Sequence, residues 1–226
     1  MMIHGDPEFV LTLHSVIEFI GTFAFALSGI RLAASKHYDW LGGFVCGVAV
    51  AIGGGTIRDV MLGVRPFWML SPIYLICTLF AQLVVIACHR YLKRLDNTWF
   101  LFDTLGLALF NIAGIQKSLE CGFSFWVAII MGCITGAAGG VIRDVLLNEE
   151  PVIFRKEIYA MACVAGGLTY WGLSYLGVSL YVTVVAAFIV VCAIRLLAVR
   201  YHISLRSEEH TSELQSLREI SYAVVC

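Results

Sequence analysis

Two arginine–aspartate pairs, Arg58–Asp59 and Arg143–Asp144, are the residues of this sequence best suited to chemistry. Both lie inside long apolar stretches, where a charge at the centre of a bilayer costs at least about 2.5–3.5 kcal/mol. Ionisable residues in such stretches usually face the interior of a helix bundle or a water-filled cavity. The two pairs are therefore candidates for charged residues that line or gate a pathway.

Two further acids, Glu18 and Asp103, lie at matching depths in other apolar stretches. We expect Glu18 to contact Arg58 and Asp103 to contact Arg143, because a buried charge without a partner is costly. If these contacts do not form, the neighbouring aspartates or a bound anion become the partners of the arginines. A purely structural role, in which the charges only satisfy one another, is the competing interpretation.

A glycine cluster precedes each arginine–aspartate pair. Glycine weakens a helix by roughly 1 kcal/mol per residue relative to alanine, so each cluster predicts a kink or a break. A break would free carbonyl groups that can coordinate a cation and amide groups that favour an anion. The alternative is close helix packing through small residues. The residues expected to form the kinks and frame the pathway are Gly53, Gly54, Gly55, Thr56, Gly136, Gly139 and Gly140.

The elements that carry these residues must be membrane helices. Of the 226 residues, 60% are hydrophobic and only 14% are charged, whereas soluble domains carry roughly 25% charged residues. This composition excludes a soluble enzyme, a disordered chain and a secreted disulfide scaffold. The net charge of −1 argues against a nucleic-acid-binding protein. The eight cysteines form no CxxC or Cys/His cluster, so we expect no metal site and no cofactor.

Seven apolar runs are long enough, or nearly so, to cross the hydrocarbon core as helices of about 20 residues. Helices rather than strands are expected, because an open strand edge would leave its backbone groups unpaired in lipid. The runs cover residues 10–30, 41–62, 73–88, 99–115, 123–147, 158–176 and 179–199.

An internal repeat relates these runs. GGTIRDVML at 54–62 aligns with GGVIRDVLL at 139–147, an offset of 85 residues that holds without a gap over 18–74 and 103–159. Each unit contains three runs, and an odd number makes the second unit enter the membrane the opposite way round. The sequence therefore predicts an all-α membrane protein with seven transmembrane helices, an inverted 3+3 repeat plus a seventh helix. The expected units are residues 8–92, 93–177 and 178–203.

The loop charges predict the orientation of the chain. Ten lysines and arginines fall on one side of the seven predicted spans and only Arg65 and Lys117 on the other. Because basic loops stay in the cytoplasm, we expect the N-terminus outside and the C-terminus inside the cell.

Residues 204–226 differ in composition from the rest of the chain. This tail can be a cytoplasmic regulatory segment or a disordered, solvated end. Its RSEEHTSELQS string also resembles the translation of a sequencing adapter, and we favour this artefact and assign the tail no function.

Two copies of a glycine cluster followed by Ile-Arg-Asp, in a seven-span chain with a 3+3 repeat, resemble the trimeric intracellular cation (TRIC) channel family. The similarity is greatest to its bacterial branch, whose members are also labelled putative glycine transporters. The resemblance implies a homotrimer in a bacterial plasma membrane, with one pathway for potassium and sodium ions in each protomer. It also implies that the kinked second and fifth helices frame the pathway with the first and fourth. Membrane lipids are the other expected partners.

The residues alone leave two functions open. The first is a passive cation channel, in which the arginines must be paired with acids or act as a gate. The second is a secondary transporter for glycine or a similar small zwitterion, whose carboxylate could bind arginine and helix amides. A membrane-embedded enzyme is not expected, because the sequence has no HExxH, GxSxG or catalytic carboxylate pair.

Overall fold

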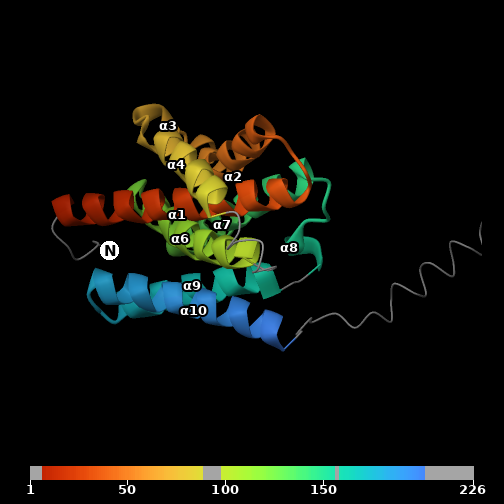
Figure 1. The fold of residues 1–226 in the computed structure, drawn as a ribbon. Coiled ribbons are helices and arrows are strands. Elements are labelled where there is room, and N and C mark those ends of the chain that lie inside the picture. The colour runs from red at the N-terminus through yellow and green to blue at the C-terminus, as the bar shows by residue number, and fades with distance from the viewer. Residues whose placement is uncertain (1–6, 89–97, 156–157, 202–226) are drawn as a thin grey trace, which may run out of the picture.

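The computed structural model describes residues 7–88, 98–155 and 158–201, and within these residues all regular secondary structure is helical (Figure 1). The helices, in chain order, are α1 (Pro7–Ser35), α2 (Trp40–Met61), α3 (Phe67–Leu70), α4 (Ile73–Ala87), α6 (Thr98–Glu120), α7 (Phe125–Leu146), α8 (Val152–Arg155), α9 (Ile158–Tyr175) and α10 (Leu180–Arg200). The tail at 204–226 lies outside the described residues.

Each of the seven predicted apolar runs holds a helix, but the helices differ in length. In the described parts of the chain, five are long and apolar enough to cross a membrane, namely α1, α2, α6, α7 and α10. The 15 residues of α4 extend only about 22 Å at 1.5 Å per residue, less than the roughly 30 Å of hydrocarbon. The short helices α3 and α8 precede α4 and α9 and lengthen these two segments.

The helix boundaries repeat along the chain. Helix α7 begins and ends 85 residues after α2, and α8 begins and ends 85 residues after α3. Two pairs of left-handed residues show the same offset: His37 with Gly122, and Gly63 with Asn148. Helix α2 ends at Met61, and the chain turns through left-handed Gly63 two residues later.

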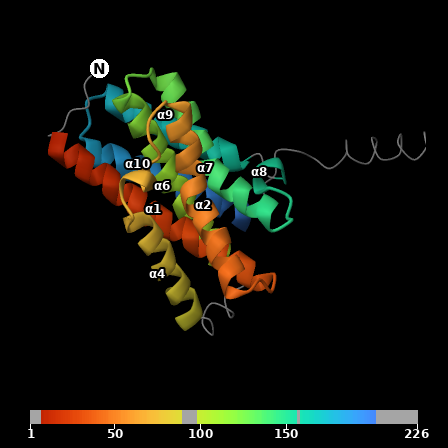
Figure 2. The ribbon, with the colours of Figure 1, turned by 90° about the horizontal axis from the view of Figure 1, so that it is seen from above.

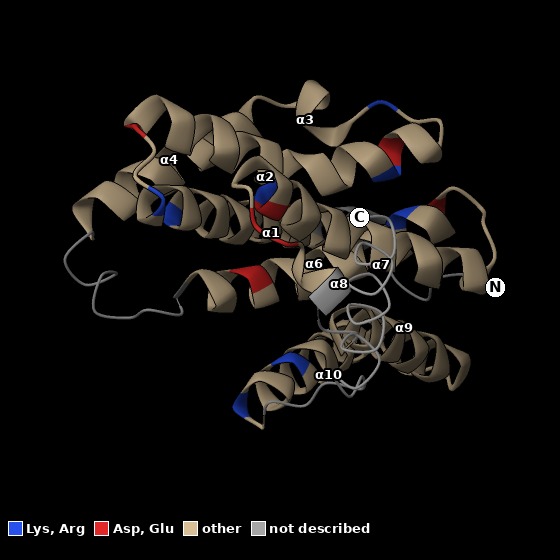
Figure 3. Cartoon of the chain, turned by 90° about the vertical axis from the view of Figure 1, so that its right-hand side faces the viewer, with Lys and Arg blue, Asp and Glu red and all other residues tan. Residues whose placement is uncertain are grey.

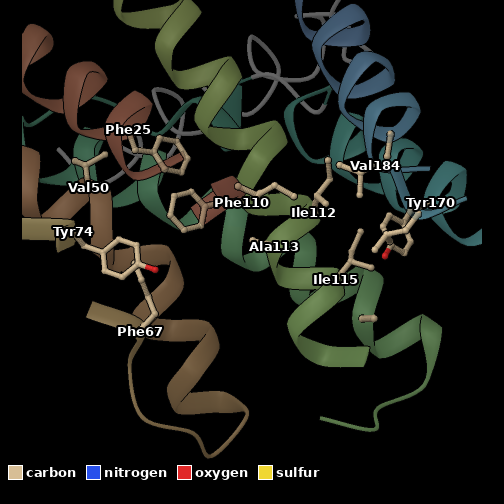
Figure 4. Packing of buried hydrophobic residues seen from close by; sticks show 14 of the residues in the cluster. Phe25, Val50, Phe67, Tyr74, Phe110, Ile112, Ala113, Ile115, Tyr170 and Val184 are labelled. Carbon is tan, nitrogen blue, oxygen red and sulfur yellow. The ribbon is translucent and has the colours of Figure 1, made fainter. Parts of the chain in front are cut away.

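Helices α1 and α6 cross antiparallel at the centre of the bundle. Gly21 packs against Phe110, and the residues 85 positions away reverse the contact, with Gly106 against Phe25. The Phe25 and Phe110 rings stack between the two helices, with their centroids 5.3 Å apart (Figure 4). Larger side chains in place of either glycine would strike a phenylalanine ring, so the sequence sets this close crossing with two glycines.

Of the predicted kink or break at each glycine cluster, the break is wrong, because α2 and α7 are continuous helices through both clusters, and the kink stays a prediction. The glycines instead let α2 and α7 approach closely, which is the small-residue packing that was the alternative. A Cβ on Gly54 would overlap the carbonyl oxygen of Thr135, and a Cβ on Gly139 would lie 3.0 Å from the carbonyl oxygen of Val50. These two contacts are again related by the 85-residue offset.

The other clustered glycines also make room for neighbours. Gly53 faces Ile142, Gly55 faces the Phe67 ring, Gly136 faces the Leu107 carbonyl, and Gly140 faces the Tyr159 hydroxyl.

The outer helices and the outer surface are those of a membrane protein. Helix α4 packs on α1 and α2, while α9 and α10 pack on α6 and α7 at the other side of the bundle (Figures 1 and 2). Large apolar side chains are exposed along these outer helices, including Ile76, Phe80 and Leu83 on α4 and Val182 and Ile189 on α10. Charged residues are sparse along the ribbons (Figure 3).

Candidate functional site: two buried charge clusters

The first charge cluster, formed by Glu18, Arg58 and Asp59 with His14 and Tyr74 around them, joins α1, α2 and α4. Arg58 Nη2 donates to Glu18 Oε1 over 2.7 Å, and Arg58 Nε donates to Asp59 Oδ1 over 2.8 Å. The Tyr74 hydroxyl donates to Glu18 Oε2 over 3.3 Å, and His14 Nε2 lies 3.2 Å from Glu18 Oε1. The predicted contact between Glu18 and Arg58 is therefore confirmed.

The second charge cluster consists of Asp103, Arg143, Asp144 and Arg195, with Ser28 beside them. Arg143 Nη1 donates to Asp103 Oδ1 over 2.6 Å and to Ser28 Oγ over 2.8 Å, and Arg143 Nε donates to Asp144 Oδ1 over 2.9 Å. Arg195, on α10, donates from Nη2 to Asp103 Oδ2 over 3.0 Å. The predicted contact between Asp103 and Arg143 is also confirmed.

The two clusters share the hydrogen bonds of their arginine–aspartate pairs. In each, the aspartate that follows the arginine accepts from that arginine with one oxygen and from a backbone N–H with the other. Asp59 Oδ2 accepts from the Phe67 N–H over 2.8 Å, and Asp144 Oδ2 accepts from the Val152 N–H over 3.0 Å. Phe67 and Val152 begin α3 and α8, so each aspartate ties the end of a long helix to the start of the next short helix.

Burial makes these contacts energetically important. Arg58, Arg143 and Asp103 have no exposed surface. Glu18 is 4% exposed and Asp59 is 1% exposed. Removing one partner of such a pair costs about 3–5 kcal/mol, because the remaining charge stays buried without compensation. The arginines also lie over aromatic rings, with the Arg143 guanidinium carbon 4.8 Å from the Trp99 ring centroid.

The clusters differ in formal charge. The first holds one guanidinium against two carboxylates, so its formal charge is −1 when His14 is neutral. The second holds two guanidinium groups against two carboxylates and is neutral. Arg195 supplies this difference, and its guanidinium also lies 4.3 Å from the Tyr159 ring centroid and 4.6 Å from that of Phe100.

Among the other predicted residues, Thr56 is bound within its own unit. Its hydroxyl donates to the Ile52 carbonyl over 2.7 Å and accepts from Trp68 Nε1 over 3.0 Å. The predicted glycines lie where α2 and α7 cross or face neighbouring helices, and one of them, Gly140, borders the second charge cluster, because a Cβ there would lie 3.1 Å from Asp103 Oδ1.

Sequence analysis missed Arg195 and His14 as cluster members. Both lie on apolar helices, and an arginine within the seventh apolar run is itself a signal of a buried partner. Arg195 lies outside the repeat, so the 85-residue offset could not identify it. His14 aligns with Trp99, and its Nδ1 lies 3.5 Å from Gln116 Oε1 on α6.

A cavity of about 460 Å³ opens beside the second cluster. Asp144 lines it together with Lys36, Glu149 and Glu150, and Lys36 pairs with Glu149. Of the four charged residues that line it, three are acidic and one is basic. No group of histidine, cysteine and acidic side chains in the described segments has the arrangement of a metal site.

A helical membrane protein that carries the same buried charge cluster in each of two repeated units has an architecture typical of transport proteins. The family model described as Glycine transporter matches residues 15–90 and again residues 100–175, so the chain belongs to this family. The two matches begin 85 residues apart, the offset of the internal repeat.

Curated relatives that are membrane proteins match most of the chain. The UPF0126 inner membrane protein YadS of Escherichia coli K12 is 39% identical over 193 residues, covering 84% of this chain and 93% of YadS. A UPF0126 membrane protein of Vibrio cholerae is 40% identical over 206 residues, covering 88% of this chain and 85% of its own length.

Solved TRIC structures share the fold. The TRIC trimeric intracellular cation channel orthologue from Rhodobacter sphaeroides has a TM-score of 0.80 and 30% identity, covering 85% of this chain and all of that chain. A prokaryotic TRIC channel in 0.5 M KCl has a TM-score of 0.78 and 28% identity over 86% of this chain and all of its own. The resemblance to the TRIC family is thus confirmed, and these relatives are membrane proteins and channels rather than enzymes.

Proposed function

We propose that this protein is a cation channel whose pathway runs through a single protomer, framed by α2 and α7 with α1 and α6. Its fold is that of proteins described as TRIC cation channels, at 28–30% identity over most of the chain. The four named helices form the centre of the bundle and supply both arginine–aspartate pairs.

The observation that carries the proposal is that every arginine of the two clusters already contacts protein carboxylates. An unpaired guanidinium in the pathway would repel cations and attract a carboxylate. Here the formal charges are −1 and zero, so the clusters present no excess positive charge to a permeating ion. This charge balance favours cations over anions.

The finer features of the channel follow from the sequence and the packing. Seven spans would result if α3 with α4, and α8 with α9, each cross the bilayer as one segment. Helices α1 and α6 are antiparallel, and the contact of Gly21 with Phe110 recurs, 85 residues away, as the contact of Gly106 with Phe25. This exchange supports an inverted repeat. The contact between the hydroxyl of Tyr38 and the carbonyl of Leu146 places the α1–α2 and α7–α8 connections on one face. Lys36 in the α1–α2 connection and Arg155 at the end of α8 support the proposal that this face is cytoplasmic, with the N-terminus on the outer side of a bacterial plasma membrane.

Potassium and sodium are the proposed ions, and a homotrimer is the proposed assembly, by similarity to the TRIC channels. The pathway residues we propose are the cluster charges Glu18, Arg58, Asp59, Asp103, Arg143 and Asp144, with the glycines and Thr56 shaping the helices around them.

A secondary transporter for glycine is the second candidate, because the matching family model carries that description. Proteoliposomes separate the two functions. Potassium-loaded vesicles that contain the protein should lose potassium when a counter-cation is supplied outside. This loss should require neither an added ionophore nor glycine. Concentrative uptake of labelled glycine, together with potassium flux that requires glycine, would instead establish the transporter.

A further inference from the structure

A second cavity, of about 480 Å³, lies away from both charge clusters, where α1 ends, α2 begins and α4 ends. Its polar lining comes from Gln82 on α4, Asp39 at the start of α2 and His37, and its aromatic lining comes from Tyr38 and Trp40. Gln82 is buried, with only 8% of its surface exposed. Its Nε2 donates to the Trp40 carbonyl over 3.4 Å, whereas its Oε1 has no donor partner among the described residues.

The fold itself does not require this glutamine. The residues 85 positions after Asp39, Gly43 and Gln82 are Ser124, Ala128 and Gly167. In the second unit Gly167 packs directly against Ile129. A buried acceptor without a donor costs about 1–3 kcal/mol, so its presence in only one unit indicates a ligand rather than a packing need.

The lining residues define the chemistry of that ligand. Gln82 Oε1 needs a hydrogen-bond donor, the Asp39 carboxylate favours a cation, and the Tyr38 and Trp40 rings favour an ammonium group. Asp39 Oδ1 accepts from the Gly42 N–H over 2.7 Å, so the carboxylate is held in place as the cap of α2. No lysine or arginine is among the described residues that line the cavity.

We propose that this cavity binds a primary ammonium group, and that its source is the headgroup of a membrane lipid of the phosphatidylethanolamine type. Apolar residues next to the lining residues in the sequence point to a lipid, because Leu41 follows Trp40, Leu83 follows Gln82, and the two leucines are 70% and 56% exposed. Ile86 and Val85 line the cavity itself and continue this apolar surface inward. The ammonium binds Gln82 and Asp39 while the acyl chains lie along α2 and α4.

Native mass spectrometry of the detergent-purified protein tests the proposal with three lipids of equal chain length. Phosphatidylethanolamine should bind at least about tenfold more tightly than phosphatidylcholine, whose trimethylammonium cannot donate to Gln82, or than anionic phosphatidylglycerol. Gln82→Leu and Asp39→Asn should each abolish this preference. Asparagine still caps α2, so Asp39→Asn keeps the fold. Thr169→Val, which removes a hydroxyl that donates to the Ala165 carbonyl on α9, is the matched control and should change nothing.

Free ethanolamine separates the two sources of the ammonium group. Millimolar ethanolamine that binds the lipid-free protein and depends on Gln82, together with no preference for phosphatidylethanolamine, would overturn the lipid as the source. Equal binding of all three lipids and no ethanolamine binding, or a preference that survives both variants, would overturn the site altogether.

Discussion

Replacing Arg58 with methionine should destabilise the protein strongly, and replacing Glu18 with glutamine in the same chain should restore part of the loss. Arg58 donates to Glu18 over 2.7 Å and to Asp59 over 2.8 Å, and all three side chains are buried. The variant Arg58→Met makes the first cluster more negative, from a formal charge of −1 to −2, with no guanidinium to balance the two carboxylates. By analogy with other buried pairs this costs about 3–5 kcal/mol.

The second substitution, Glu18→Gln, removes one of the two uncompensated charges and keeps an oxygen that can accept from Tyr74. A hydrogen bond to a charged group contributes about 1.5–3 kcal/mol, so the double variant should regain about that much. The assay is a double-mutant cycle. The free energy of unfolding of each variant is measured by denaturant titration in mixed micelles. The result should be a coupling energy of 1.5 kcal/mol or more, on the order of the charged hydrogen bond.

An exposed pair provides the control for this cycle. Lys117 and Glu120 lie three residues apart on α6, 3.5 Å from each other and partly exposed, so Lys117→Met and Glu120→Gln should couple by less than about 0.5 kcal/mol. Strictly additive effects of Arg58→Met and Glu18→Gln would refute the account of a mutually dependent buried cluster.

Three further expectations follow from the packing and the charges. Gly54→Leu should lower the unfolding free energy by about 1–3 kcal/mol or more, because the added side chain would clash with a backbone carbonyl. Gly172→Leu, whose Cβ would meet no atom within 4 Å, should have little effect in the same denaturation assay. Arg195→Met should destabilise the protein by about 1.5–3 kcal/mol, since it removes one of two cationic partners of a buried aspartate, and an unchanged melting curve would contradict this role. A reporter fused after Arg200 should be cytoplasmic and one fused near His4 external, and both on one side would exclude seven spans.

Sequence reasoning located the charge pairs because their partners share the repeat offset and the depth in the membrane. It misjudged the glycine clusters because helix propensities are measured in water. Three glycines favour a break by roughly 3 kcal/mol in total, but a break in lipid leaves several backbone groups unpaired at several kcal/mol each. The continuous helix therefore wins, and the missing side chains allow α2 and α7 to touch.

The contribution of Arg195 could not be derived from the repeat, because α10 has no counterpart in either unit. Its partner depends on how α10 packs against α6, which is a tertiary contact. The termini of α3 and α8 were missed for a similar reason. Their N–H groups are capped by Asp59 and Asp144 from eight residues earlier, across a turn whose geometry depends on left-handed Gly63 and Asn148.

Single-channel recording of the purified protein in a planar bilayer tests the central claim most directly. With potassium chloride at unequal concentrations on the two sides, the account predicts discrete current steps that reverse near the potassium equilibrium potential, in the absence of glycine. A bilayer with verified, folded protein that shows no unitary currents, or currents that reverse near the chloride potential, would contradict a cation channel built around paired arginines.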